Sequence, residues 1–130
     1  MKIIVICQRG NVRSVTVASI LKDYFGYIDV LSMGWQTTSV QTANMLLLWA
    51  NRVVLAGGID IKDGLEPFMD ILGKKQITWL SGIDNDTWGR PMHIDLVRTC
   101  LQLLENSGFE KQWNVYNTAV DYENAVRKIN

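Results

Sequence analysis

A cysteine and an arginine lie six residues apart near the N-terminus, with a serine directly after the arginine. The segment reads Cys7-Gln8-Arg9-Gly10-Asn11-Val12-Arg13-Ser14. Five intervening loop residues can wrap their backbone N–H groups around a phosphate-sized anion, and an arginine at this spacing can hold two of its oxygens bidentately. Cys7 would lie at the bottom of this cup, where the N–H groups and Arg13 favour the thiolate. A thiolate in that position is a nucleophile for phosphorus.

The residues on either side of this segment favour an anion-binding loop. An apolar run at residues 3–6 precedes Cys7 and an amphipathic pattern follows Arg13, so a strand leads into the loop and a helix leads out of it. Gly10 and Asn11 tolerate the backbone angles that a tight loop requires. In the alternative interpretation, Cys7 is a buried residue at the end of a strand and the arginine only begins a surface helix.

A second polar segment follows a predicted strand at residues 76–80. It reads Ser81-Gly82-Ile83-Asp84-Asn85-Asp86-Thr87-Trp88-Gly89-Arg90-Pro91. Cleavage of a phosphate monoester needs a proton donor near the leaving oxygen, and an aspartate within hydrogen-bond reach supplies one. Asp84 and Asp86 are two residues apart, so in an extended loop only one should face the anion cup. The alternative is an ordinary turn rich in Asp, Asn and Gly.

The Cys7 segment resembles the low-molecular-weight protein tyrosine phosphatase family, which also opens with a strand, a Cys-x5-Arg-Ser loop and a helix. The resemblance implies a protein tyrosine phosphatase that acts through a phosphocysteine intermediate and needs no cofactor. The family places its general acid after the fourth strand, as an Asp followed by Pro and an aromatic residue. Asp86-Thr87-Trp88 resembles that motif with Thr in place of Pro. We therefore choose Asp86 as the acid and keep Asp84 as the alternative.

The loop departs from the family pattern at two places. The family loop reads Cys-x-Gly-Asn-x-Cys-Arg-Ser, whereas Gly10 and Asn11 lie one position later here, which is nearer the dual-specificity form Cys-x-x-Gly-x-x-Arg-Ser. Val12 replaces the family's second loop cysteine. We expect a divergent member in which the nucleophile and the anion cup are retained, with Gln8, Arg9, Gly10, Asn11 and Val12 as the substrate-binding residues.

Five further side chains are weaker candidates for the site. Trp35 and Trp88 each follow a predicted strand, so they could wall a cleft that stacks an aryl phosphate, or they could simply be packing residues. Ser14 could hydrogen-bond the Cys7 sulfur, or it could cap the following helix. His93, placed in the first turn of a long helix, has no neighbour that suggests a metal ligand set. Cys100 is expected to be an inert core residue.

The length and the composition predict a single domain over residues 1–130, and the order of the predicted elements makes it an α/β domain. Strands are expected at residues 2–6, 27–31, 52–55 and 76–80, and helices at 14–25, 40–50, 61–72, 91–106 and 121–129. Ser39 is the expected cap of the second helix, and residues 45–49 its buried face. This alternation predicts a three-layer open sheet of four parallel strands with helices on both faces, and a site at the carboxyl ends of the strands. The resemblance implies the strand order 2-1-3-4.

The charge balance excludes a general polyanion binder. Thirteen basic and thirteen acidic residues leave no global field that would attract nucleic acid. We also expect a cytoplasmic protein without membrane association, because no leader and no apolar run of about 18 residues is present. The expected partners are a phosphorylated protein or a small aryl phosphate as substrate, and phosphate or another oxyanion in the loop.

Three other functions remain open. A phosphocarrier like the IIB subunits of sugar phosphotransferase systems resembles this fold and uses a cysteine after the first strand, but Arg13 and the late aspartates argue against it. An arsenate reductase needs further cysteines, and Cys100 alone is a poor supply. The third is a catalytically silent module that binds phosphorylated partners. Turnover of an aryl phosphate would distinguish an enzyme from such a module.

Overall fold

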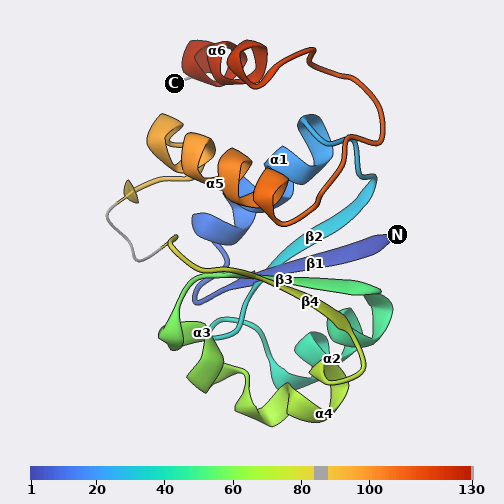
Figure 1. Cartoon of the computed structure of the whole chain (residues 1–130). Coiled ribbons are helices and arrows are strands. Elements are labelled where there is room, and N and C mark those ends of the chain that lie inside the picture. Colours follow the sequence, from blue (N-terminus) through green and yellow to red (C-terminus); the bar gives the residue numbers. More distant parts are fainter. Residues whose placement is uncertain (84–87, 130) are drawn as a thin grey trace.

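The computed structural model describes residues 1–83 and 88–129, with the backbone alone at 59–61, and forms a parallel sheet between two layers of helices (Figure 1). The strands are β1 (Lys2–Cys7), β2 (Asp29–Gly34), β3 (Arg52–Ala56) and β4 (Gln76–Leu80), in the order β2-β1-β3-β4. The helices are α1 (Arg13–Asp23), α2 (Val40–Trp49), α3 (Ile59–Gly64), the 3-10 helix η1 (Glu66–Phe68), α4 (Met69–Leu72), α5 (Ile94–Asn106) and α6 (Ala119–Ile129). The predicted fold class and strand order are confirmed.

The central strand β1 is buried on both faces of the sheet. The side chains of Ile3, Ile4, Val5 and Ile6 are all completely buried, as expected for a parallel strand with helices above and below it. Helices α1 and α5 cover one face, with α6 outside them, and α2, α3 and α4 lie on the other face (Figure 1). Cys7 therefore leaves the sheet from its middle, at the carboxyl ends of the strands.

Several predicted boundaries are wrong by two or three residues; the second strand, for example, ends at Gly34 rather than residue 31. The second strand begins at Asp29 rather than residue 27, because the end of α1 uses Gly26 at a φ of +83° and the Tyr27 N–H donates to the Leu21 carbonyl. The long helix begins at Ile94 rather than residue 91, because Met92 adopts a φ of 60°.

Two predictions for the second helical layer are also wrong in part. The helix expected at 61–72 is divided into α3, η1 and α4, since Pro67 in η1 has no N–H to continue a helix. In α2 the expected buried face is half exposed, with Met45 at 69 % and Leu48 at 66 % exposure, because the helix packs through Ala43 and Leu47. Ser39 is confirmed as the cap and accepts from the Thr42 N–H. No helix in the described ranges is long and apolar enough to span a membrane.

Candidate active site

The Cys7 sulfur lies at the end of β1 and is held by two groups of the following loop. The Gly10 N–H donates to Sγ at 3.2 Å, and the Cys7 thiol donates to Ser14 Oγ at 3.1 Å. Cys7 is 2 % exposed and Ser14 is completely buried. The helix that follows is capped by the backbone of Val12, whose side chain makes no capping hydrogen bond, so Ser14 is not the cap. Two donors thus converge on the sulfur once it loses its proton.

The direction of the loop N–H groups follows from a brace formed by residues 35–37. The Trp35 N–H donates to the Cys7 carbonyl at 3.0 Å, the Gln36 N–H donates to the Gln8 carbonyl at 2.9 Å, and the Thr37 hydroxyl donates to the Arg9 carbonyl at 2.9 Å. In a trans peptide the C=O and the next N–H point in opposite directions. Three successive carbonyls that point toward the brace therefore turn the N–H groups of residues 8, 9 and 10 away from it, and the last of these reaches the sulfur.

The brace requires glycine on both sides of the contact. Gly10 has a φ of +74°, and a Cβ there would lie 2.4 Å from the Gly34 nitrogen. A Cβ on Gly34 would lie 2.1 Å from the carbonyl carbon of Arg9. This arrangement follows from the strand register, in which Cys7 pairs with Gly34. Sequence analysis missed Gly34, Gln36 and Thr37, and it considered Trp35 only as a possible wall of a cleft; the available signal was a glycine at the end of the second strand, followed within three residues by Gln and Thr.

The positive charge of Arg13 and the N-terminus of α1 both lie at the end of the loop. Arg13 begins α1 and is 3 % exposed, so it is not the surface residue that the alternative interpretation requires. The N-terminus of α1 presents backbone N–H groups and the positive end of the helix dipole, which favours an anion. An arrangement of this kind can bind a small oxyanion such as phosphate.

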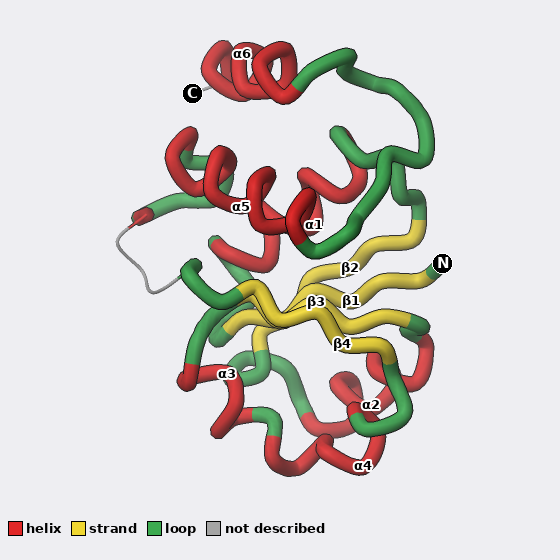
Figure 2. The backbone as a smooth tube through the Cα atoms, in the orientation of Figure 1, coloured by secondary structure: helices red, strands yellow, loops and turns green. Residues whose placement is uncertain are grey.

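A second connection links this helix to the segment that precedes α5. The hydroxyl of Thr16 donates to the Val12 carbonyl at 2.8 Å and accepts from the Met92 N–H at 2.9 Å. Thr16 is completely buried. The loop after β1 and residues 88–93 consequently lie at the same end of the sheet (Figure 2). Sequence analysis did not single out Thr16, because an isolated threonine in a helix carries no pattern.

A shallow hollow opens beside the loop. Its described lining consists of Arg9, Asn11, Val12 and Gly89, and Arg9 and Asn11 are exposed. Gln8 is half-buried and its side-chain amide donates to Gln36 Oε1 at 3.4 Å. The predicted acids Asp84 and Asp86, together with Thr87, lie outside the described residues. Within the described ranges no group of three His, Cys, Asp or Glu side chains could hold a metal ion.

Neither Trp35 nor Trp88 is among the described residues that line this hollow. Trp35 packs its indole against Gly64 of α3, where an added Cβ would lie 2.1 Å from the ring. Trp88 is half-buried, with its ring centroid 6.0 Å from that of His93. His93 is the cap of α5 rather than a residue of its first turn, and its Nδ1 accepts from the Asp95 N–H at 3.2 Å. Trp35 therefore contacts α3 and Trp88 lies beside His93, while the histidine caps α5; a role of the two tryptophans in substrate binding stays a prediction.

The second cysteine, Cys100, lies in an environment that does not favour a reactive thiolate. Cys100 in α5 is completely buried, and burial raises the pKa of its thiol to about 12. Both cysteines are free. The position of Cys100 agrees with the expected inert core residue.

Comparison with known proteins defines the class of fold. The chain matches no model of a protein family and no curated protein. It does share its fold with a solved structure, the YwlE arginine phosphatase from Geobacillus stearothermophilus. The TM-score is 0.54, the sequence identity is 18 %, and the match covers 98 % of this chain and 94 % of that chain. At this identity the likeness establishes the fold alone.

Proposed function

We propose that this chain is a phosphomonoesterase that acts through a phosphocysteine intermediate, as a divergent relative of the low-molecular-weight protein tyrosine phosphatases. The observation that carries the proposal is the Cys7 sulfur, which receives the Gly10 N–H at 3.2 Å inside a loop whose preceding N–H groups are turned the same way. The shared fold with an arginine phosphatase supports the same general activity. A cytoplasmic setting belongs to the proposal, because the thiolate must stay reduced.

In this mechanism the Cys7 thiolate attacks phosphorus in line, and the bond between phosphorus and the leaving group breaks. Arg13 and the loop N–H groups of residues 8–13 hold the equatorial oxygens as their charge grows. Asp86 gives its proton to the leaving atom. In the second step Asp86 takes a proton from water, which attacks phosphorus and releases phosphate and the thiolate. The Ser14 hydroxyl, 3.1 Å from the sulfur, stabilises the departing thiolate by donating to it.

Two substrate classes follow from different observations. The resemblance of the loop favours phosphotyrosine, whose leaving atom is a phenolic oxygen. The fold neighbour is named an arginine phosphatase, which favours phosphoarginine, whose leaving atom is a guanidine nitrogen. Both leaving groups need the proton that Asp86 supplies. We propose phosphotyrosine first, with phosphoarginine as the second candidate.

The other three functions differ from this proposal in what each of them requires. A reductase needs a second thiol that can reach the first, whereas Cys100 is completely buried and burial raises its pKa. A phosphocarrier has to preserve its phosphocysteine, whereas this proposal places an acid and a base beside it. A silent binding module would need no proton donor at all.

The decisive experiment compares the wild-type chain with Cys7→Ser in turnover of p-nitrophenyl phosphate and in binding of inorganic phosphate. We expect Cys7→Ser to abolish turnover and retain phosphate binding, because the cup consists of backbone and Arg13. Intact-mass analysis after rapid quenching should detect a phosphorylated Cys7 only in the wild type. Turnover by Cys7→Ser would contradict the nucleophile. Stoichiometric phosphorylation without release would favour a carrier, and binding without chemistry a silent module.

The acid is assigned by comparing Asp86→Asn with Asp84→Asn. Asp86→Asn should slow hydrolysis of an alkyl or tyrosyl phosphate by about 10²-fold, and slow an ester with a very acidic leaving group less. Asp84→Asn serves as the matched control, since it removes a carboxylate two residues away. If Asp84→Asn shows the leaving-group dependence and Asp86→Asn behaves like the wild type, the two roles are reversed and the mechanism stands.

A further inference from the structure

The outer strand β4 has an unprotected edge. It pairs with β3 on one side, and no strand in the described part of the chain pairs with its other side. Natural proteins protect such edges with lysine, proline or a bulge, because the free N–H and C=O groups would otherwise pair with another chain. The strand reads Gln76-Ile77-Thr78-Trp79-Leu80 and contains no charged residue and no proline.

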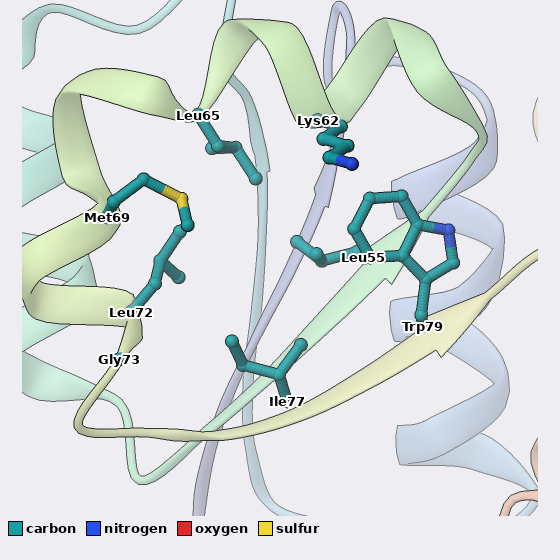
Figure 3. Close-up of a pocket in the computed structure, with 8 residues that line it drawn as sticks. All are labelled: Leu55, Lys62, Leu65, Met69, Leu72, Gly73, Ile77 and Trp79. Atoms are coloured by element: carbon teal, nitrogen blue, oxygen red, sulfur yellow. The ribbon is translucent and has the colours of Figure 1, made fainter.

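The same strand exposes large apolar side chains on one face. Ile77 is 43 % exposed and Trp79 is 40 % exposed, and their spacing of two residues places both on the side of α3 and α4. Figure 3 shows them at a hollow between the sheet and these helices, with Met69 on its opposite side. The hollow measures ≈ 190 Å³, and Lys62 is the single charged residue of its described lining. Exposed apolar side chains beside an open strand edge are typical of an interaction surface.

We propose that β4 pairs antiparallel with the β4 of a second copy of this chain, around a two-fold axis at Thr78. This register places Ile77 opposite Trp79 of the second copy, and by symmetry the second copy's Ile77 opposite Trp79. Pairs of an aromatic and a β-branched residue stabilise antiparallel strands. An antiparallel strand added at the edge of a parallel sheet is a common arrangement.

The charges of the strand agree with this register. Gln76–Leu80 carries no charged side chain, so the pairing places no two like charges opposite each other, and Lys74 and Lys75 lie in the turn before the strand. The two apolar hollows lie next to each other across the axis, and each copy extends the apolar wall of the other. One strand pair and a few side chains form an interface at the small end of the known range, so the dimer should be weak and form at roughly micromolar or higher concentration.

Sedimentation velocity over a wide concentration range tests the proposal directly. We expect the wild-type protein to change from a 14.8 kDa monomer to a dimer as its concentration rises. Ile77→Lys, which introduces a typical protecting residue into the edge, should weaken the dimer by about tenfold or more. Ile28→Lys is the matched control, because Ile28 is 84 % exposed and lies just before the strand at the opposite edge. A protein that stays monomeric, or a dimer that survives Ile77→Lys, would overturn the proposal.

Disulfide trapping tests the register. A mixture of Ile77→Cys and Trp79→Cys proteins should cross-link faster than either protein alone, because directly opposite Cα atoms lie at roughly 4.5–5.5 Å and diagonal positions lie farther apart. The mixed dimer also retains one native pair of Ile77 and Trp79. Both proteins carry Cys7→Ser, so that the reactive thiol of the loop cannot cross-link, and the native Cys100 is completely buried. Equal rates in the mixture and in the separate proteins would refute this pairing.

Discussion

Replacing Gly34 by alanine tests the brace with one methyl group placed outside the loop itself. The added Cβ would lie 2.1 Å from the carbonyl carbon of Arg9 and 2.4 Å from the Gly10 nitrogen. Ordinary contact begins at 3.4 Å, so the end of β2 and the loop must separate by about 1.3 Å. Gly34 does not use the left-handed backbone region, so the effect comes from the contact alone. We expect the N–H groups of the loop to move by a similar distance.

The magnitude follows from how strongly catalysis depends on position. A displacement of about 1 Å in a catalytic group costs roughly 10²-fold in rate, or about 2.7 kcal/mol in the activation free energy. The measurements are kcat/KM for p-nitrophenyl phosphate and the Kd of inorganic phosphate by calorimetry, with thermal unfolding to show that the variant is folded. Gly73→Ala is the matched control, because Gly73 has a φ of −61° and its nearest neighbouring atom lies at 3.3 Å. Its activity and stability should change by less than about 0.5 kcal/mol.

The result that would refute this reasoning is a folded Gly34→Ala protein with wild-type phosphate affinity. The loop would then keep its shape without the close approach of β2, and the direction of its N–H groups would have another cause. Loss of turnover with unchanged phosphate binding would also contradict the prediction, since the same N–H groups bind the ground-state anion.

Three further predictions concern helix α1 and the two thiols. Thr16→Val should lower the free energy of unfolding by about 1–3 kcal/mol, because it leaves the Val12 carbonyl and the Met92 N–H without the hydroxyl between them. Thr16→Ser keeps the hydroxyl and should retain the stability of the wild type. A Thr16→Val protein as stable as the wild type would contradict the link between α1 and the segment before α5. Iodoacetamide near neutral pH should modify Cys7 at least about tenfold faster than Cys100, whose buried thiol has a raised pKa. Phosphate should protect Cys7, and peroxide should oxidise it without forming an internal disulfide, as mass analysis can show; a rapid disulfide between the two cysteines would contradict this prediction.

The elements that form the loop could be predicted because their signals are local. An apolar run, a cysteine, a glycine-containing loop and an amphipathic helix follow one another within residues 2–25, and the structure has β1, the loop and α1 there. The fourth strand is predicted without error at Gln76–Leu80, because Gly73 and two lysines precede it and Gly82 follows it. In both cases adjacent residues decide the result.

The brace could not be predicted because it depends on strand register. Thr37 and Arg9 are 28 residues apart, and they meet only because Cys7 pairs with Gly34 across two parallel strands. Parallel register is fixed by tertiary packing of both faces rather than by any short motif. The exposed Met45 and Leu48 of α2 show the same limit, since a helix that is apolar around most of its surface does not reveal which side packs.

The shifted glycine of the loop can be understood from the same brace. Gly10 and Asn11 lie one position later than in the family that the loop resembles, and the Asn11 side chain is exposed here. The carbonyls of Cys7, Gln8 and Arg9 are fixed by residues 35–37, outside the loop. A loop oriented from outside tolerates changes in its own sequence as long as glycine remains at the point of closest approach. This explains how the loop can direct the Gly10 N–H to the Cys7 sulfur although its glycine is shifted by one position.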